Sequence, residues 1–210
     1  MAALPSIAYI DTWQALHRPA VSALIAVLND YGVPPAGRAA QPLTPAESEA
    51  VAQAGVVALT AAFQAYVVRL FEVTADGLTG DRMVAVRLRE THVVGREGHR
   101  RFSSPSPEAV RGLFNALFDV LLPGEDIWFG VTVGTHTWQG ATAAPLSERD
   151  TQTLVEDHLN LRHKIAHGAP VPTVSPHEVA ERLAVFDQIV LALDNSARRL
   201  ILQHTRRPPW

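Results

Sequence analysis

Residues 44–74 read TPAESEAVAQAGVVALTAAFQAYVVRLFEVT, and this stretch decides the fold. Thr44 is a favourable N-cap, Pro45 suits the first helical position, and Glu47 completes a capping box. Apolar side chains then recur on most faces of the predicted helix. A helix that is apolar on most faces is expected to lie buried among other helices.

Four more segments carry the start and stop signals of helices. Asp11 is expected to cap a first helix that ends at Gly32, before a loop rich in proline and glycine. Ser106, Ser147 and Ser175 are expected to cap three later helices, two of which have proline at the first helical position. Together with the central helix, these segments indicate an all-α protein.

Two segments are harder to assign. In residues 79–103, the alternation of Val84 and Val86 fits a strand, whereas Asp81 as a cap fits a short helix, which we favour. Residues 124–142 hold β-favouring side chains interrupted by glycine, without a partner strand, and are expected to form an ordered loop. The prediction is a single-domain helical bundle of about five or six helices. It comprises an N-terminal helix and loop (1–43), a helical domain (44–205) and a frayed tail (206–210).

The composition restricts the classes of function. The 210 residues contain 0 Cys, which excludes disulfides and thiolate chemistry and leaves few zinc-site patterns. The net charge of -3 gives no overall attraction to nucleic acid, so any such binding must come from a local patch. No apolar run approaches the roughly 20 residues of a membrane helix. We expect a cytoplasmic protein with no membrane partner, no cofactor and no metal.

One short segment gathers unusual polar chemistry. Residues 160–168 read NLRHKIAHG and hold Arg162, His163, His167 and the only lysine of the chain, Lys164. A helix that ends at the glycine of this segment would place these side chains in its last turns.

Helical geometry separates the side chains of this segment into two groups. At about 100° per residue, Leu154, Leu161 and Ile165 fall within about 40° of one another and are expected to face the core. Arg162 and His167 point about 140° apart, which is too wide for both to meet one ligand from a single straight helix.

The flank between these two polar residues suggests a second copy of the chain as partner. Leu159, His163 and Ala166 form this flank, and the small Ala166 would let two backbones approach closely. Two copies meeting here across a two-fold axis would bring two arginines and two histidines into one cleft. Such a cleft suits phosphoryl transfer on RNA, because histidine moves protons near neutral pH and arginine stabilises charge on a phosphorane. No metal is needed, because RNA supplies its own 2′-hydroxyl nucleophile.

Two other interpretations of the segment stay open. Cationic side chains at a helix C-terminus are stabilised by the helix dipole alone. His163 and His167 also stand one turn apart, as in zinc peptidase helices, but that motif has a glutamate directly after its first histidine. Lys164 occupies that position here, so we disfavour a metal site.

The segment LRHKIAHG resembles the signature of the HEPN superfamily, in which a histidine follows an arginine by four to six positions. More narrowly, the chain resembles the RiboL-PSP-type HEPN domains of bacterial defence and toxin–antitoxin loci. The likeness includes FQAYVVRLFE, SPSPEAVRGLFNALFDVLL and the long helix after SPHEV, and it covers most of residues 44–203 in order.

This resemblance implies an all-α, often dimeric, metal-independent endoribonuclease, with Arg162 and His167 as the catalytic pair. The family commonly has asparagine directly after the arginine, whereas this chain has His163, which is either a further acid–base residue or a polar filler at the interface. The implied role is that of a toxin or defence effector with an RNA substrate and an antitoxin or defence-system partner protein. The alternative is a catalytically silent HEPN module that dimerises or docks a partner.

Arginines elsewhere are candidates for holding the RNA backbone. One group lies between residues 82 and 101, with two glutamates nearby, and consists of Arg82, Arg87, Arg89, Arg96, Arg100 and Arg101. A second basic cluster lies near the C-terminus and consists of Arg198, Arg199, Arg206 and Arg207. For any one of these residues, a solvated surface arginine is the simpler interpretation.

Overall fold

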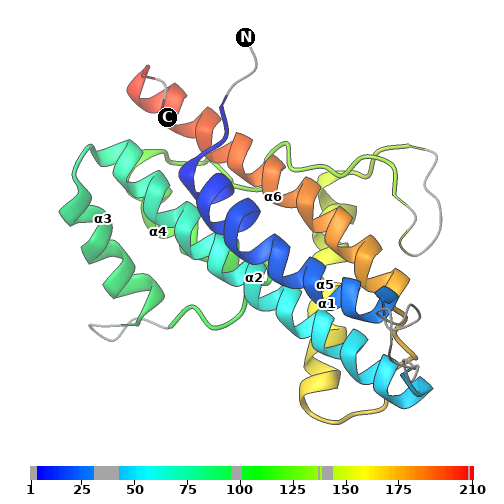
Figure 1. The fold of residues 1–210 in the computed structure, drawn as a ribbon. Helices are drawn as coiled ribbons and strands as arrows, with labels where there is room; N and C mark the ends of the chain where they lie inside the picture. The colour runs from blue at the N-terminus through cyan, green and yellow to red at the C-terminus, as the bar shows by residue number, and fades with distance from the viewer. Residues whose placement is uncertain (1–3, 31–42, 96–100, 137, 139–143, 208) are drawn as a thin grey trace.

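The computed structural model describes residues 4–30, 43–95, 101–136, 138, 144–207 and 209–210. Within these residues the chain forms helices and connecting segments and no strand, so the predicted all-α class is confirmed. The elements follow in the order η1 (Ala8–His17), α1 (Arg18–Asp30), α2 (Pro45–Thr79), α3 (Arg82–Leu88), η2 (Arg89–Val93), α4 (Pro107–Leu121), α5 (Glu148–Ala166) and α6 (Pro176–Thr205), where η marks a π-helical segment. The other helices pack around α2 (Figure 1).

The central helix α2 forms as its sequence predicts. The Glu47 amide donates to the Thr44 hydroxyl at 3.3 Å, and the Thr44 amide donates to the Glu47 carboxylate at 2.8 Å, which completes the capping box. The helix ends at Gly80, whose φ of 65° lies in the left-handed region. Helix α2 is long and apolar enough to meet the length and composition of a membrane-spanning helix, which the buried core helix of a bundle also meets. Half of its most apolar 18-residue window is buried inside the bundle.

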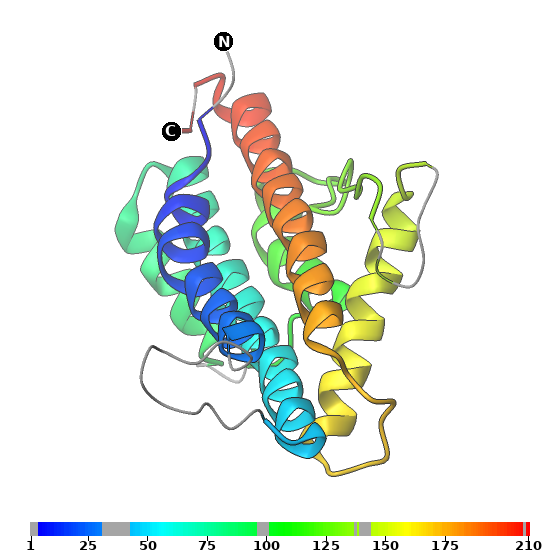
Figure 2. The ribbon, with the colours of Figure 1, turned by 45° about the vertical axis from the view of Figure 1, so that its right-hand side comes forward.

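Helix α6 runs beside α2 in the same direction (Figure 1, Figure 2). The two helices approach closely because α2 has glycine at two contact points. A Cβ atom at Gly55 would lie 2.9 Å from Val179 Cγ1, and one at Gly77 would lie 2.9 Å from Ile201 Cδ1. Both distances are shorter than a carbon contact allows, so a larger residue at either position would require Val179 or the flexible end of Ile201 to move.

The N-terminal helices share the core of the bundle. Asp187 on α6 accepts hydrogen bonds from the Trp13 indole N–H at 2.7 Å and from the Arg18 guanidinium at 2.9 Å. Asp194, also on α6, is buried and accepts a hydrogen bond from the Ser6 amide at 2.9 Å. Burial raises the pKa of Asp194 above its ordinary value, and the hydrogen bonds from Ser6 oppose this effect. These polar contacts fix the N-terminal segment to the last helix of the chain.

Two predictions about helix ends are wrong. The first helix begins at Ala8, so Asp11 lies within its first turn and does not cap it. The tail 206–210 was expected to fray, but Trp210 is half-buried against the main core. Gly32, the predicted end of the first helix, lies outside the described residues.

The described parts of the two segments that were hard to assign agree with the favoured predictions. Asp81 caps α3, and its carboxylate accepts a hydrogen bond from the Met83 amide at 2.8 Å. The described residues between α4 and α5 have no regular helix or strand, but the loop is ordered by its apolar side chains. Trp128, for example, is fully buried and donates from its indole N–H to the Pro107 carbonyl at 3.0 Å.

Candidate active site

Helix α5 ends in a hydrogen-bonded turn that fixes the backbone at His167. The Gly168 amide donates to the Ile165 carbonyl at 3.2 Å, and the Ala169 amide donates to the Lys164 carbonyl at 3.0 Å. This pair of bonds is a Schellman motif, which needs a left-handed residue after the C-cap. Gly168 supplies that conformation with a φ of 63°. The predicted end of the helix is confirmed, and the letters IAHG form a helix-ending signal as well as part of the candidate site.

The three candidate catalytic side chains lie in the last turns of α5. Arg162 is half-buried, whereas His163 and His167 are exposed. The two imidazole rings contact each other, with centroids 4.2 Å apart and ring planes inclined by 53°. Among the described residues, no carboxylate forms an ion pair with any of the three. In the described part of the chain, the end of α5 therefore presents two cations, Arg162 and Lys164, and two imidazole rings, with no carboxylate in ion-pair contact with the three candidates.

The opposite face of α5 packs against the bundle as the spacing predicts. Leu154 is buried in the main core. Leu161 and Ile165 are partly buried against a second apolar cluster that is formed by the start of α2 and the start of α6: Ala52, Val56, Val174 and Val179. This packing holds the end of α5 beside the N-terminal ends of α2 and α6 (Figure 2).

The predicted dimer flank is only partly available to a second copy. Leu159 is half-buried and packs against the core of its own chain. His163 and Ala166 are exposed and could contact a partner. The surface open to a second copy is thus narrower than the sequence suggested and centres on the last two turns of α5.

On one chain, the first predicted RNA-binding group lies away from the candidate site. Arg89 pairs with Glu72 at 2.6 Å, in the C-terminal half of α2. The end of α5 packs near Val56, in the N-terminal half of the same helix. At a rise of 1.5 Å per residue, Glu72 and Val56 are about 24 Å apart along the helix axis. The structure does not gather the described arginines of this group with Arg162 and His167.

The individual arginines of this group differ in their surroundings. Arg82, Arg87 and Arg101 are exposed, while Arg89 is ion-paired with Glu72 and Glu90. Arg96 and Arg100 lie outside the described residues.

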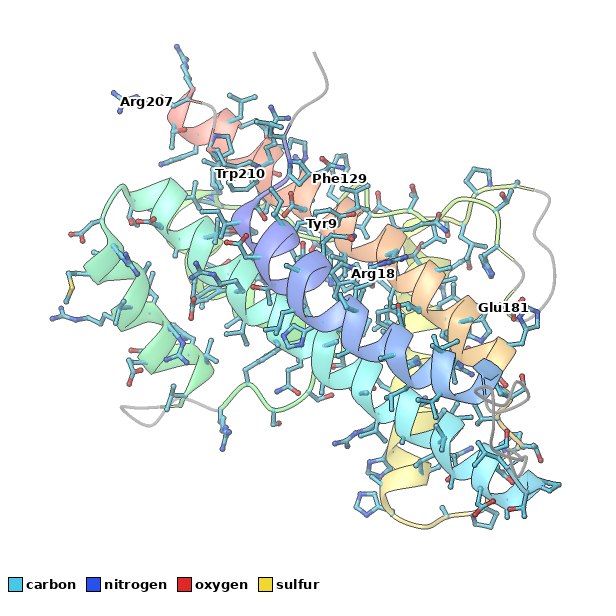
Figure 3. All side chains as sticks on the ribbon, viewed as in Figure 1. Tyr9, Arg18, Phe129, Glu181, Arg207 and Trp210 are labelled. Carbon is cyan, nitrogen blue, oxygen red and sulfur yellow. The ribbon has the colours of Figure 1, made fainter. Side chains whose placement is uncertain are left out.

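The second basic cluster is divided between half-buried and exposed positions. Arg199 pairs with Glu125 at 3.3 Å and lies over the Phe129 ring at 4.9 Å, so its charge is already engaged. Arg206 and Arg207 are exposed, and Arg207 extends from the end of α6 (Figure 3).

One turn before the candidate site, α5 also carries a buried polar cluster. His158 is fully buried, with its Nε2 atom 3.0 Å from the Thr60 hydroxyl on α2. Its Nδ1 atom lies 3.4 Å from a guanidinium nitrogen of Arg182 on α6. Arg182 is itself buried, forms an ion pair with Glu178 and lies over the Trp138 ring at 4.3 Å. The cluster joins α2, α5 and α6 through side chains that have partners within the protein.

His158 is neutral at neutral pH because its surroundings oppose a positive charge. Burial, and then the charge of Arg182, lower the pKa of His158 to about 3, against a smaller opposing effect of a hydrogen bond to the Val56 backbone. His158 was not among the residues that the sequence pattern marked as functional. Its position was available from helical spacing, because His158 follows Leu154 by four and precedes Leu161 by three, on the buried face.

The comparisons with known proteins add no relative. No protein-family model, no curated protein and no solved structure matches this chain. The described residues also contain no group of three or more histidine, cysteine, aspartate or glutamate side chains placed to hold a metal ion. The resemblance to HEPN domains rests on the residues already quoted.

Proposed function

We propose that the protein is a metal-independent endoribonuclease whose active site is formed by the ends of two α5 helices. The observation that carries this proposal is the group of Arg162, His163 and His167 at the end of α5, with both imidazoles exposed and no carboxylate paired with any of the three among the described residues. A site with cationic and proton-transferring side chains suits a phosphodiester substrate, because the substrate is negatively charged and its cleavage requires proton transfer.

The reaction needs a base, an acid and a charge stabiliser. One histidine takes the proton of the RNA 2′-hydroxyl as that oxygen attacks the adjacent phosphorus atom. The bond from phosphorus to the 5′-oxygen then breaks, and a protonated imidazole returns a proton to the leaving oxygen. Arg162 stabilises the charge on the phosphorane between these steps. The products are a 2′,3′-cyclic phosphate and a 5′-hydroxyl end.

A second copy of the chain completes this site. Arg162 and His167 diverge by about 140° around α5, so one helix does not direct both at the same phosphate. A two-fold axis near Ala166 would place the arginine of one protomer opposite the histidine of its partner. In this arrangement His163 either supplies the second proton-transfer group or stacks on His167 to orient it.

The biological role that fits such an enzyme is that of a toxin or defence effector in the cytoplasm, held inactive by a partner protein until it is needed. An unrestrained ribonuclease would damage the cell that makes it, so an antitoxin or defence-system partner is part of the proposal. The exposed arginines of α3 and of the C-terminal end are candidates for contacts with RNA from either protomer.

The test is RNA cleavage by the purified protein in the presence of a chelator. We expect cleavage to persist in EDTA and to leave cyclic-phosphate and 5′-hydroxyl ends. Loss of activity in EDTA that is restored by zinc or magnesium would contradict the proposal, as would 5′-phosphate ends.

A second candidate is a silent module that dimerises or docks a partner. The Schellman motif favours it, because a helix-ending role accounts for IAHG without catalysis. The helix dipole likewise accounts for cationic residues in the last turn of α5. A stable dimer without cleavage of any RNA, with or without metal ions, would support this candidate.

A further inference from the structure

We propose that His163 and His167 together bind a divalent transition-metal ion and that the bound ion switches the ribonuclease off. Both side chains are exposed, and their rings are in contact at a centroid distance of 4.2 Å. The spacing of four residues alone did not justify a metal site. The contact between the rings supports a metal site, because it shows that both imidazoles lie on the same side of the helix end.

The distances fit a bidentate site. Imidazole nitrogens bind zinc at about 2.0–2.1 Å, so two nitrogens in neighbouring positions around one ion stand about 3 Å apart. Small rotations of two exposed rings that already touch bring one nitrogen of each to that separation. Imidazole suits Cu²⁺, Ni²⁺ and Zn²⁺, whereas Mg²⁺ prefers oxygen ligands.

The site would be reversible and regulatory. Only two protein ligands are present, since the described residues hold no group of three or more suitable side chains. The other coordination positions remain for water. The exposed Lys164 brings a positive charge next to the site and should weaken binding. Such a site fills and empties with the supply of free metal ion.

Binding of the ion would stop catalysis by occupying the base. A nitrogen lone pair that is donated to a metal ion is no longer free to accept the proton of the 2′-hydroxyl. This inhibitory part rests on the proposed function, whereas the binding part does not require that the protein cleave RNA.

The binding part is tested on RNA-free protein by calorimetric titration with Zn²⁺ and by Cu²⁺ electron paramagnetic resonance. We expect one ion per His163–His167 pair, nitrogen couplings in the Cu²⁺ spectrum, and no binding of Mg²⁺. His163→Ala and His167→Ala should each weaken binding at least about tenfold. His204→Ala, which removes a lone exposed histidine in the last turn of α6, should leave binding unchanged. Lys164→Gln should bind the ion more tightly than the wild type.

Equal binding by the wild type and both histidine variants, or no binding at all, would overturn the inference.

The inhibitory part is then tested by adding Zn²⁺ to a cleavage reaction. We expect inhibition that EDTA reverses and that appears at the concentration at which the pair fills. Binding without inhibition of an active enzyme would remove the regulatory claim alone. Binding by a protein that cleaves no RNA would contradict the proposed function and leave the metal site standing.

Discussion

Helix α5 and its C-cap carry histidine in two contrasting environments that lie five to nine residues apart. His158 is buried, contacts Thr60 and Arg182, and has its pKa lowered to about 3. His163 and His167 are exposed at the helix end and contact each other. The comparison teaches that residue type does not decide the role of a histidine. A buried ring whose nitrogens have partners connects helices, and an exposed pair is available for chemistry.

The largest expected effect on stability is at the buried histidine. His158→Ala removes a fully buried ring and leaves the Thr60 hydroxyl and the Arg182 guanidinium without that contact. We expect the free energy of unfolding to fall by about 3 kcal/mol, as for other large-to-small core substitutions. Urea denaturation measures this, and a loss below about 0.5 kcal/mol would show that the cluster is not structural.

The same histidine should make stability depend on pH. Its pKa is about 3 in the folded protein and near 6.5 when unfolded, so below pH 6.5 the unfolded chain binds a proton that the folded chain does not. Stability should therefore fall as the pH drops from about 6.5 towards 3, by up to about 1.4 kcal/mol per pH unit. Asp194, whose pKa is raised, contributes with the opposite sign.

His158→Asn is the control for this pH effect, because asparagine does not titrate and Asp194 is retained. The measurement is the slope of the unfolding free energy against pH, between pH 6.5 and 4.5, for both proteins. A slope that is identical in the wild type and the variant would contradict the assignment.

A smaller effect on the free energy of unfolding is expected at Gly168, which ends α5 next to the exposed pair His163 and His167. Gly168→Ala forces a side chain onto a φ of 63°, which costs about 1 kcal/mol. It should also lower RNA cleavage, because the Schellman motif positions His167. Gly112→Ala in α4 is the matched control, since a Cβ there meets nothing within 4 Å and φ is ordinary, and it should be neutral or stabilising. Equal melting temperatures for the two variants would show that the turn is not specified by its glycine.

The smallest effect on the stability of a single chain is expected at Ala166, on the predicted two-fold axis. Ala166 is exposed, so Ala166→Arg should change the stability of the monomer by less than about 0.5 kcal/mol. It should nevertheless split the dimer, because a long charged side chain would have to be desolvated at the axis. Light scattering of both proteins at micromolar concentration measures this, and a monomeric wild type would contradict the shared site.

The sequence predicted those features of the fold that depend on neighbouring residues. Thr44, Ser106, Ser147 and Ser175 cap helices as expected, because a cap is decided by a few adjacent residues. The predicted cap at Asp11 is wrong. The N-terminal segment is held by Asp187 and Asp194 on α6, and these contacts between distant parts of the chain are not part of any local sequence pattern.

The candidate site likewise has features that the sequence predicts and features that it does not. The buried face of α5 and its end at Gly168 followed from spacing and turn chemistry. The partners of His158 come from α2 and α6, far away in the sequence, and so could not be found from the spacing on α5 alone. The contact between His163 and His167 likewise depends on side-chain conformations that spacing does not determine.

The central claim is that the exposed end of α5 carries out catalysis while the buried cluster maintains the fold. The most direct test compares RNA cleavage rate and melting temperature for the wild type, Arg162→Ala, His167→Ala and His158→Asn. Arg162→Ala and His167→Ala should each lower the rate by roughly 10² or more with little change in melting temperature. His158→Asn should lower the melting temperature while its folded fraction still cleaves RNA. The account is contradicted if Arg162→Ala or His167→Ala loses activity only in proportion to lost folding.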